Sequence, residues 1–264
     1  MIRRLSERDH EKCLELLKPK SAENLFILGD IEAFGYEQEF QKVWGDFDSA
    51  GNLRGVLLKY KGNYIPYAAS EDFDAEGFAS IISEDGDLQM LSGLKSVAQR
   101  VFPYINRKLA RHRELFYAKC SGVTNVMQSA DFTEVKRAGL QDVERIMELY
   151  KQIPEFADST ETVEDKRKNM KKGVSRTYYI ERDGKMVSVA STAAENSLSA
   201  MVVGVGTIDG YKRQGLASRC ISKLCLDVLS VGKELCLFYD NPEAGRIYKR
   251  IGFEDIDRWM MYIY

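Results

Sequence analysis

The residues best suited to chemistry lie between an apolar strand and a helix in the last quarter of the chain. The segment reads Lys212-Arg213-Gln214-Gly215-Leu216-Ala217. The N-terminus of a helix binds anions because it carries unpaired N–H groups and a partial positive charge. Gly215 and Ala217 would let a pyrophosphate approach the backbone, and Lys212 and Arg213 add positive charge. The spacing alone is equally consistent with an anion site and with an ordinary strand-to-helix turn.

A second candidate segment is a short helix near the C-terminus. Asn241 is a good N-cap, and Pro242 occupies the first helical position, where its missing N–H costs nothing. Gly252 ends the helix. Asn241, Ala244 and Tyr248 share one face because they are spaced i, i+3 and i+7. Considered alone, Tyr248 would be a half-buried aromatic residue on a packing face.

The elements that must position these residues alternate in type. The second half of the chain predicts the order β-α-α-β-β-β-α-β-α-β, with Asp-Gly marking a hairpin turn. The expected ranges are Val135–Ala138, Gln141–Gln152, Thr162–Lys172, Thr177–Glu181, Met186–Thr192, Ala200–Thr207, Leu216–Val231, Leu235–Tyr239, Pro242–Ile251 and Trp259–Tyr264. The fold class is therefore α/β, an α+β mixed sheet with covering helices.

Both segments resemble signatures of the GNAT superfamily of N-acetyltransferases. The acetyl-CoA pyrophosphate loop of that family has the pattern Gln/Arg-x-x-Gly-x-Gly/Ala, and here Lys212 stands where Gln or Arg is usual. The pattern Asn-x-x-Ala-x-x-x-Tyr-x-x-x-Gly-Phe, from Asn241 to Phe253, matches the late motif of the family at every position. The two motifs also occur in the order typical of the family.

The resemblance implies roles for particular residues. It implies that the backbone of Val203 and Val205 pairs with the pantetheine arm of acetyl-CoA, with an N–H near Val203 facing the thioester carbonyl. Tyr248 would protonate the CoA sulfur, since a phenol with a pKa of about 10 is protonated at neutral pH. Asn241 would hydrogen-bond to the cofactor arm. The pyrophosphate would bind at Lys212, Arg213, Gln214, Gly215, Leu216 and Ala217.

The general base is an open question at this stage. Glu195 is the acidic residue nearest to the cofactor strand, and it is the candidate catalytic base, although carboxylates in turns are normally solvated. Asp240 is an alternative that could simply cap the following helix. Many enzymes of this class use water or no dedicated base.

The chain also contains a weak internal repeat with an offset of 133 residues. Ile2–Leu17 aligns with Val135–Tyr150, and the identical pairs are Arg4/Arg137, Asp9/Asp142, Glu11/Glu144, Glu15/Glu148 and Leu16/Leu149. Strand–turn–helix segments can resemble one another by chance. The favoured interpretation is two tandem GNAT-like domains, a degenerate one at 1–132 and the N-acetyltransferase domain at 133–264.

The first half has no second copy of either motif. Ser92–Ser96 resembles Gln214–Ser218, but Lys95 replaces the small residue, and acidic residues precede the segment at Glu84, Asp85 and Asp87. An anion would be repelled there. The first half is therefore expected to shape the acceptor pocket or to stabilise the second half.

Composition limits the classes of partner. The 264 residues carry a net charge of −2, which gives no basic footprint for nucleic acid and argues against attachment to anionic membranes. Five cysteines without CxxC spacing indicate reduced thiols, and two histidines make a metal site improbable. With no signal-peptide core and no long apolar run, the expected location is cytoplasmic.

The leading prediction is an acetyl-CoA-dependent N-acetyltransferase that uses acetyl-CoA as co-substrate and no metal. Its acceptor would be an amine of a small molecule or of a protein or peptide, and a homodimer is compatible with the sequence. The alternatives are a non-catalytic acyl-CoA-binding or regulatory module and an aminoacyl transferase that uses charged tRNA. The neutral charge balance and the intact loop disfavour the last of these.

Overall fold

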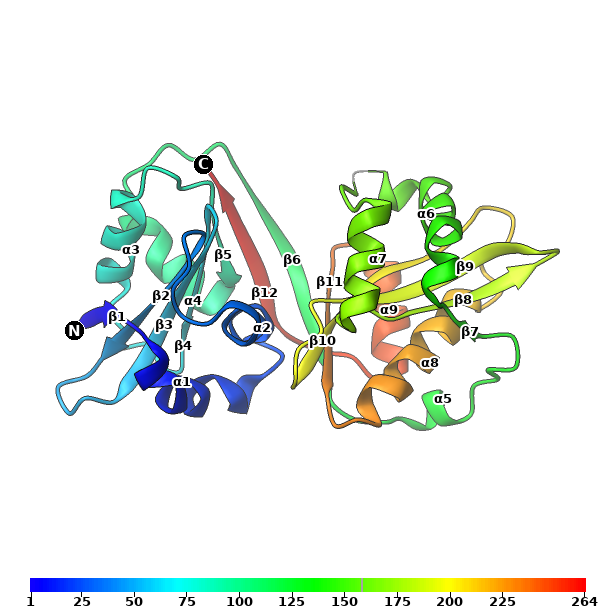
Figure 1. Ribbon diagram of the computed structural model, residues 1–264, viewed down its shortest axis with the longest axis horizontal. Helices are drawn as coiled ribbons and strands as arrows, with labels where there is room; N and C mark the ends of the chain where they lie inside the picture. The colour runs from blue at the N-terminus through cyan, green and yellow to red at the C-terminus, as the bar shows by residue number, and fades with distance from the viewer. Residues whose placement is uncertain (158) are drawn as a thin grey trace. The chain divides into compact units, whose positions relative to one another are not determined.

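The structure, a computed structural model, describes residues 1–157 and 159–264. The chain forms two compact units (Figure 1). Unit 1 contains Met1–Tyr117, Phe238–Asp240 and Asp255–Tyr264. Unit 2 contains Ala118–Leu237 and Asn241–Glu254. The chain therefore passes from unit 1 to unit 2 after Tyr117, contributes residues 238–240 to unit 1, and ends in unit 1 with residues 255–264.

Unit 1 is built around a mixed sheet with the strand order β1-β2-β3-β4-β5-β12-β6. Its strands and helices are β1 (Ile2–Arg4), α1 (His10–Leu17), α2 (Leu25–Phe34), β2 (Gln41–Phe47), β3 (Leu53–Tyr60), β4 (Asn63–Ala68), α3 (Ala75–Glu84), β5 (Met90–Leu94), α4 (Lys95–Val101), β6 (Arg111–Cys120) and β12 (Glu254–Ile263). Strands β4 and β5 pair in parallel, and the C-terminal strand β12 pairs with β5 in antiparallel orientation.

Unit 2 has the strand order β11-β10-β9-β8-β7. Its elements are α5 (Asn125–Gln128), β7 (Lys136–Arg137), α6 (Val143–Lys151), α7 (Val163–Lys172), β8 (Thr177–Arg182), β9 (Lys185–Ala193), β10 (Ser199–Thr207), α8 (Leu216–Leu229), β11 (Glu234–Tyr239) and α9 (Pro242–Ile251). Short 3₁₀ helices lie in the two units at Glu7–Asp9, Lys18–Lys20, Phe102–Tyr104, Leu140–Asp142 and Pro154–Phe156.

Local chemistry explains where the elements of unit 2 begin and end. The β8–β9 hairpin has a two-residue turn in which Asp183 and Gly184 both have positive φ, as a type I′ turn requires. Helix α7 begins with a capping box between Thr162 and Asp165 and ends at Gly173, whose φ is 75°. The Asp-Gly hairpin predicted from the sequence is thereby confirmed.

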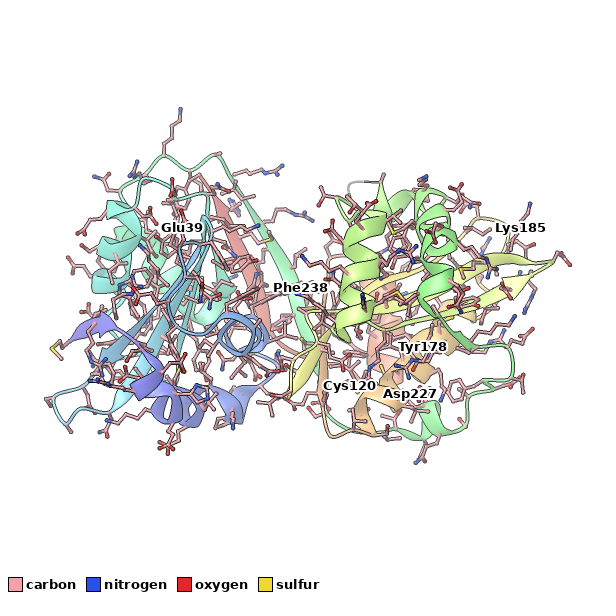
Figure 2. All side chains as sticks on the ribbon, in the orientation of Figure 1. Glu39, Cys120, Tyr178, Lys185, Asp227 and Phe238 are labelled. Carbon is pink, nitrogen blue, oxygen red and sulfur yellow. The ribbon has the colours of Figure 1, made fainter. Side chains whose placement is uncertain are left out.

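Helices α6 and α8 cover opposite faces of the unit 2 sheet. Tyr179 belongs to an apolar cluster with Ile146 and Leu149 of α6. The neighbouring Tyr178 donates its hydroxyl to Asp227 of α8 (Figure 2). Because successive residues of a strand point to opposite faces, the two helices must lie on different sides of β8.

The element order predicted for the second half is confirmed, as is the mixed α/β fold. The last strand is longer than predicted, at Glu254–Ile263, and most of it belongs to unit 1. The division of the chain into domains 1–132 and 133–264 stays a prediction. The two compact units are not continuous in sequence, since residues 238–240 and 255–264 lie in unit 1.

Candidate functional site

The candidate site begins where strand β10 loses one of its two neighbours. Its first three residues, Ser199 to Met201, pair in parallel with β11. Beyond Met201, the structure of the described residues shows pairing of β10 with β9 alone. The second half of β10 therefore has a free edge, at which backbone N–H and C=O groups can bind another extended chain.

A β-bulge lies in this free half. Val203 is opposite Ser191 of β9, and Gly206 is opposite Val189, so β10 has one residue more than its partner. Gly204 adopts a φ of 58°, which favours glycine. Bulges redirect the groups around them and are frequent beside active sites. The structure places Val203 and Val205, the predicted partners of the pantetheine arm, in this bulged and partly exposed stretch.

The predicted phosphate loop follows β10 and leads into α8. Gly215 is the N-cap of α8 and has a φ of 75°. The backbone N–H of Arg219 donates to the carbonyl of Gly215, so the N–H groups before it are those that a helix leaves without an internal acceptor. Arg213 also has a positive φ, 65°, which is uncommon for a residue with a side chain. Alternating backbone conformations of this kind form concave anion-binding nests.

The side chains around the loop differ in how they are engaged. Lys212 forms ion pairs with Asp209 at 3.0 Å and with Glu155 at 3.5 Å. Arg213 is exposed and has no ion pair among the described residues, so its charge is available to an anion. A side chain added at Gly215 would find no heavy atom within 4 Å. Gln214 is exposed, Leu216 is buried, and Ala217 is partly buried, so the loop combines an open surface with an anchored helix.

Helix α9 carries the second predicted motif. The Asn241 side chain caps α9 by accepting from the backbone N–H of Glu243 at 2.9 Å. Tyr248 is partly buried and contacts Phe253 edge-on, with ring centroids 6.0 Å apart. Burial raises the pKa of Tyr248 above its ordinary value near 10, so the hydroxyl is protonated at neutral pH. These positions are compatible with a proton donor, and the roles of both residues stay predictions.

Sequence reasoning missed Arg250. Its Nη2 donates to the hydroxyl of Ser218 at 3.3 Å, in the first turn of α8. The guanidinium therefore lies beside the same helix N-terminus as the phosphate loop. Arg250 belongs to neither motif pattern, and only the packing of α9 against α8 reveals it.

The structure does not bring Glu195 to the bulge. Its carboxylate is buried and is bound by Arg176, at 2.6 and 3.0 Å, and by Lys233 at 2.8 Å. Glu195 also precedes β10, and at about 3.3 Å per residue some ~13 Å of strand separates Ser199 from Val203. Both oxygens of the carboxylate are occupied by these hydrogen bonds, so this arrangement argues against Glu195 as general base. Asp240, the alternative, lies in unit 1 and pairs with Arg113 at 3.7 Å.

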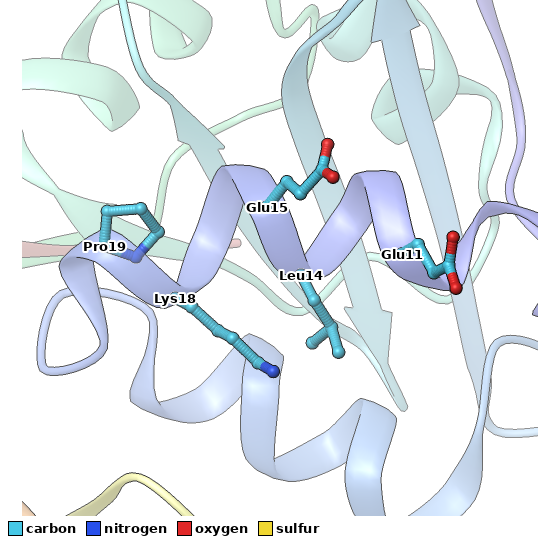
Figure 3. A pocket seen from close by; sticks show the side chains of 5 residues that line it. All are labelled: Glu11, Leu14, Glu15, Lys18 and Pro19. Carbon is cyan, nitrogen blue, oxygen red and sulfur yellow. The ribbon is translucent and has the colours of Figure 1, made fainter.

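Two hollows in the surface differ in their position relative to the motifs. One of 560 Å³ in unit 1 is lined by α1 and the 3₁₀ helix that follows it, through Glu11, Leu14, Glu15, Lys18 and Pro19 (Figure 3). It belongs to the unit that carries neither motif. One of 430 Å³ in unit 2 lies between α6, the β8–β9 hairpin and Ile208 and Tyr211, directly before the phosphate loop. The second is thus the hollow that borders the candidate site.

No group of three or more metal-ligating side chains occurs in the described part of the chain. Over the same residues, no helix is both long and apolar enough to span a lipid bilayer. All five cysteines are buried, and no disulfide joins them in the described structure. The free strand edge, the open helix N-terminus and the available guanidinium fit the parts of an acyl-CoA molecule.

Comparison with known proteins identifies the class of protein to which this fold belongs. A family model described as GNAT acetyltransferase matches residues 125–262, more than half of the 264 residues. The chain therefore belongs to the GNAT acetyltransferase family, whose chemistry is acyl transfer. No curated protein gives a significant match.

Solved structures show the same fold across the whole chain. A Drosophila protein has a TM-score of 0.69 at 11% identity, covering 99% of this chain and 98% of its own. A GCN5-related N-acetyltransferase from Sphaerobacter thermophilus has a TM-score of 0.63 at 11% identity, covering 99% and 94%. A tandem GNAT protein from the clavulanic acid biosynthesis pathway has a TM-score of 0.57 at 11% identity, covering 100% and 98%. The predicted tandem GNAT-like fold is confirmed.

Proposed function

We propose that the protein is an acetyl-CoA-dependent N-acetyltransferase that transfers the acetyl group to an amine of a small molecule or a protein. The observation that carries this proposal is the free, bulged half of β10 that leads directly to the open N-terminus of α8. One extended ligand could bind at both places, with its amide groups pairing with the free edge of β10 and its phosphates at the N-terminus of α8.

The phosphate end of acetyl-CoA would bind at α8. Its pyrophosphate would accept hydrogen bonds from the backbone N–H groups around Gly215, and Arg213 would supply positive charge. Lys212 would exchange one of its carboxylate partners for phosphate. The small Ala217 and Gly215 leave room for this approach. The amides of the pantetheine arm would pair with the backbone of Val203 and Val205, extending the sheet.

The reaction has three requirements: a stabilised oxyanion, a proton for the leaving thiolate and removal of the amine proton. The amine nitrogen attacks the thioester carbonyl, and the oxygen that gains negative charge would be stabilised by backbone N–H groups at the bulge. The C–S bond then breaks, and the thiolate would take a proton from the Tyr248 hydroxyl. The amine proton would leave through water, because Glu195 is committed to Arg176 and Lys233.

The remaining parts of the proposal concern partners and place. The acceptor would be a small-molecule or peptide amine, and the protein would act in the cytoplasm without nucleic acid or membrane. Unit 1 would support unit 2 rather than bind a cofactor of its own. A homodimer is compatible with this scheme.

The test is calorimetric titration of the full chain with acetyl-CoA, beside two glycine variants. Gly215→Glu puts bulk and negative charge at the phosphate position. Gly232→Glu is the matched control, because Gly232 lies at the other end of α8 with a φ of 77° and equally open surroundings. The proposal expects binding by the wild type and by Gly232→Glu, and loss of binding in Gly215→Glu.

A panel of amines with thiol detection of released CoA then tests turnover. Release that depends on the amine supports acetyl transfer. Binding without turnover over a broad panel would instead favour a non-catalytic acyl-CoA-binding module. Equal binding by all three proteins would contradict the placement of the cofactor.

A further inference from the structure

A buried tyrosine contacts the bulge of β10 from the α6 side of the sheet. Tyr150, near the end of α6, is 6% exposed. A Cβ atom at Gly204 would lie 2.5 Å from Tyr150 Oη and 3.0 Å from Tyr150 Cζ. The tyrosine hydroxyl therefore rests directly on the glycine backbone, and only a residue without a side chain allows this contact. Together with the positive φ, the contact explains why glycine lies between Val203 and Val205.

The hydroxyl of Tyr150 is held by a buried hydrogen-bond chain. It lies 2.9 Å from Ser191 Oγ, which lies 2.8 Å from Thr177 Oγ1. Lys166 Nζ donates to Tyr150 Oη at 3.4 Å. The Lys166 ammonium can only donate, whereas either hydroxyl can be the donor between Tyr150 and Ser191. The chain therefore holds the Tyr150 hydroxyl in position.

Lys166 is unusual for a lysine because its side chain is 1% exposed. Fully buried lysines are rare unless paired. Its carboxylate partner, Glu161, lies at 3.8 Å, and its ammonium is also 5.5 Å from the centre of the Tyr150 ring. The protein thus keeps a buried lysine in hydrogen-bond contact with the Tyr150 hydroxyl.

The same hydrogen-bond chain reaches both strands of the bulge. Ser191 is the residue of β9 that pairs with Val203, at the point where the register of β10 shifts. Tyr150 thus contacts Gly204 on one strand and hydrogen-bonds to the partner of Val203 on the other. Any shift of the Tyr150 hydroxyl would be transmitted to the backbone N–H groups of the bulge.

We propose that Tyr150 is a positioning residue for acetyl transfer, and that its hydroxyl fixes the bulge whose N–H groups face the thioester carbonyl. This inference rests on the proposed function and deepens it. Stabilisation of the developing oxyanion depends on donor placement at the level of tenths of an ångström. The hydroxyl would therefore affect the chemical step more than cofactor binding, since the pyrophosphate binds elsewhere, at α8.

The first experiment compares two tyrosine variants of the full chain. Tyr150→Phe removes the hydroxyl and keeps the ring. Tyr178→Phe is the matched control, because Tyr178 is also a buried tyrosine of unit 2, and its hydroxyl bonds to Asp227 on the other face of the sheet. We expect Tyr150→Phe to lower kcat about 10-fold with the KM for acetyl-CoA nearly unchanged. The control should keep the wild-type kcat.

The second experiment is a double-variant cycle at the contact. Gly204→Ala should lower kcat for two reasons. The Cβ of the alanine would clash with Tyr150 Oη, and the alanine would have to adopt a positive φ, which is unfavourable for a residue with a side chain. In the double variant Gly204→Ala/Tyr150→Phe, the hydroxyl that would clash with the alanine is absent. Gly204→Ala should therefore lower kcat less in the Tyr150→Phe background than in the wild type. Amide hydrogen exchange at 203–206, which needs no turnover, should be faster in Tyr150→Phe than in Tyr178→Phe.

The outcomes separate this inference from the proposed function. If the wild type transfers acetyl groups and Tyr150→Phe matches Tyr178→Phe in kcat and in exchange, the positioning role is wrong and the function stands. If the wild type binds acetyl-CoA and transfers nothing to any amine, the function fails and the inference with it. A kcat loss that follows a loss of folded protein, measured by thermal unfolding, would also overturn the positioning role.

Discussion

Arg250 on α9 donates a hydrogen bond to Ser218 in the first turn of α8, over 3.3 Å. This contact places a guanidinium at a helix N-terminus that already carries a partial positive charge. Such an arrangement costs energy when the site is empty and stabilises an anion when one binds. Arg250 is exposed, so its cost in the free protein is small. We therefore expect it to contribute to cofactor affinity.

Arg250→Ala should raise the KM for acetyl-CoA by roughly 3- to 10-fold and leave kcat nearly unchanged, because an exposed charge pair with phosphate is worth about 1 kcal/mol. The effect should shrink as salt concentration rises. Lys249→Ala removes the same charge from the same turn and should have the smaller effect. Equal effects of the two variants would show that only the net charge of α9 matters.

Tyr248→Phe should lower kcat by about 100-fold, the usual contribution of a general acid. The hydroxyl acts in its protonated form, and burial raises its pKa above the ordinary value near 10. Its contribution is therefore complete at neutral pH and is lost only as pH rises through that raised pKa. Wild-type kcat, measured from pH 6 to pH 10, should show no decline from this group below about pH 10. If Tyr248→Phe had the same kcat as the wild type over this pH range, Tyr248 would not be the general acid.

Glu195→Gln should affect stability and not chemistry. The substitution leaves Arg176 and Lys233 beside a neutral amide in a buried place. Breaking a buried ion pair from one side costs about 3 kcal/mol or more. Urea unfolding should show this loss, whereas kcat of the folded variant should stay within about twofold of the wild type. A folded, stable variant with a large loss of kcat would restore Glu195 as the base.

The sequence predicts the fold of unit 2 well because its signals are local. Turn residues, caps and alternation mark each element, as at Asp183 and Gly184 in the hairpin and Asn241 at α9. The repeat also has a structural counterpart. Asp9 accepts from the N–H of Ser6 at 3.0 Å, and Asp142 accepts from the N–H of Gly139 at 2.9 Å. In both repeats, an aspartate just before the helix accepts a hydrogen bond from the backbone N–H three residues earlier.

What the sequence does not predict depends on contacts between distant residues. The pairing of β12 with β5 joins residues more than 160 positions apart, and no local pattern encodes the choice of partner strand. Glu195 was the candidate base because it is the acidic residue nearest to the cofactor strand. Its partners Arg176 and Lys233 lie 19 and 38 positions away, so no local pattern shows that its carboxylate is occupied. Tyr150 looked like an ordinary helix residue until its contact with Gly204 was seen. The available signal was a glycine between Val203 and Val205.

Each chain should bind one acetyl-CoA, because the comparable helix start in unit 1 is already filled. Asp257 of β12 accepts hydrogen bonds from the backbone N–H of Ser96 at 3.1 Å and from its hydroxyl at 2.7 Å, at the start of α4. A resident carboxylate both occupies these donors and repels a phosphate, whereas the loop before α8 has no such occupant among the described residues. Calorimetry should therefore give a stoichiometry near one, and Asp257→Asn should leave it unchanged because the amide oxygen still accepts. A stoichiometry near two, or loss of binding on Asp257→Asn, would show that unit 1 takes part in binding the cofactor.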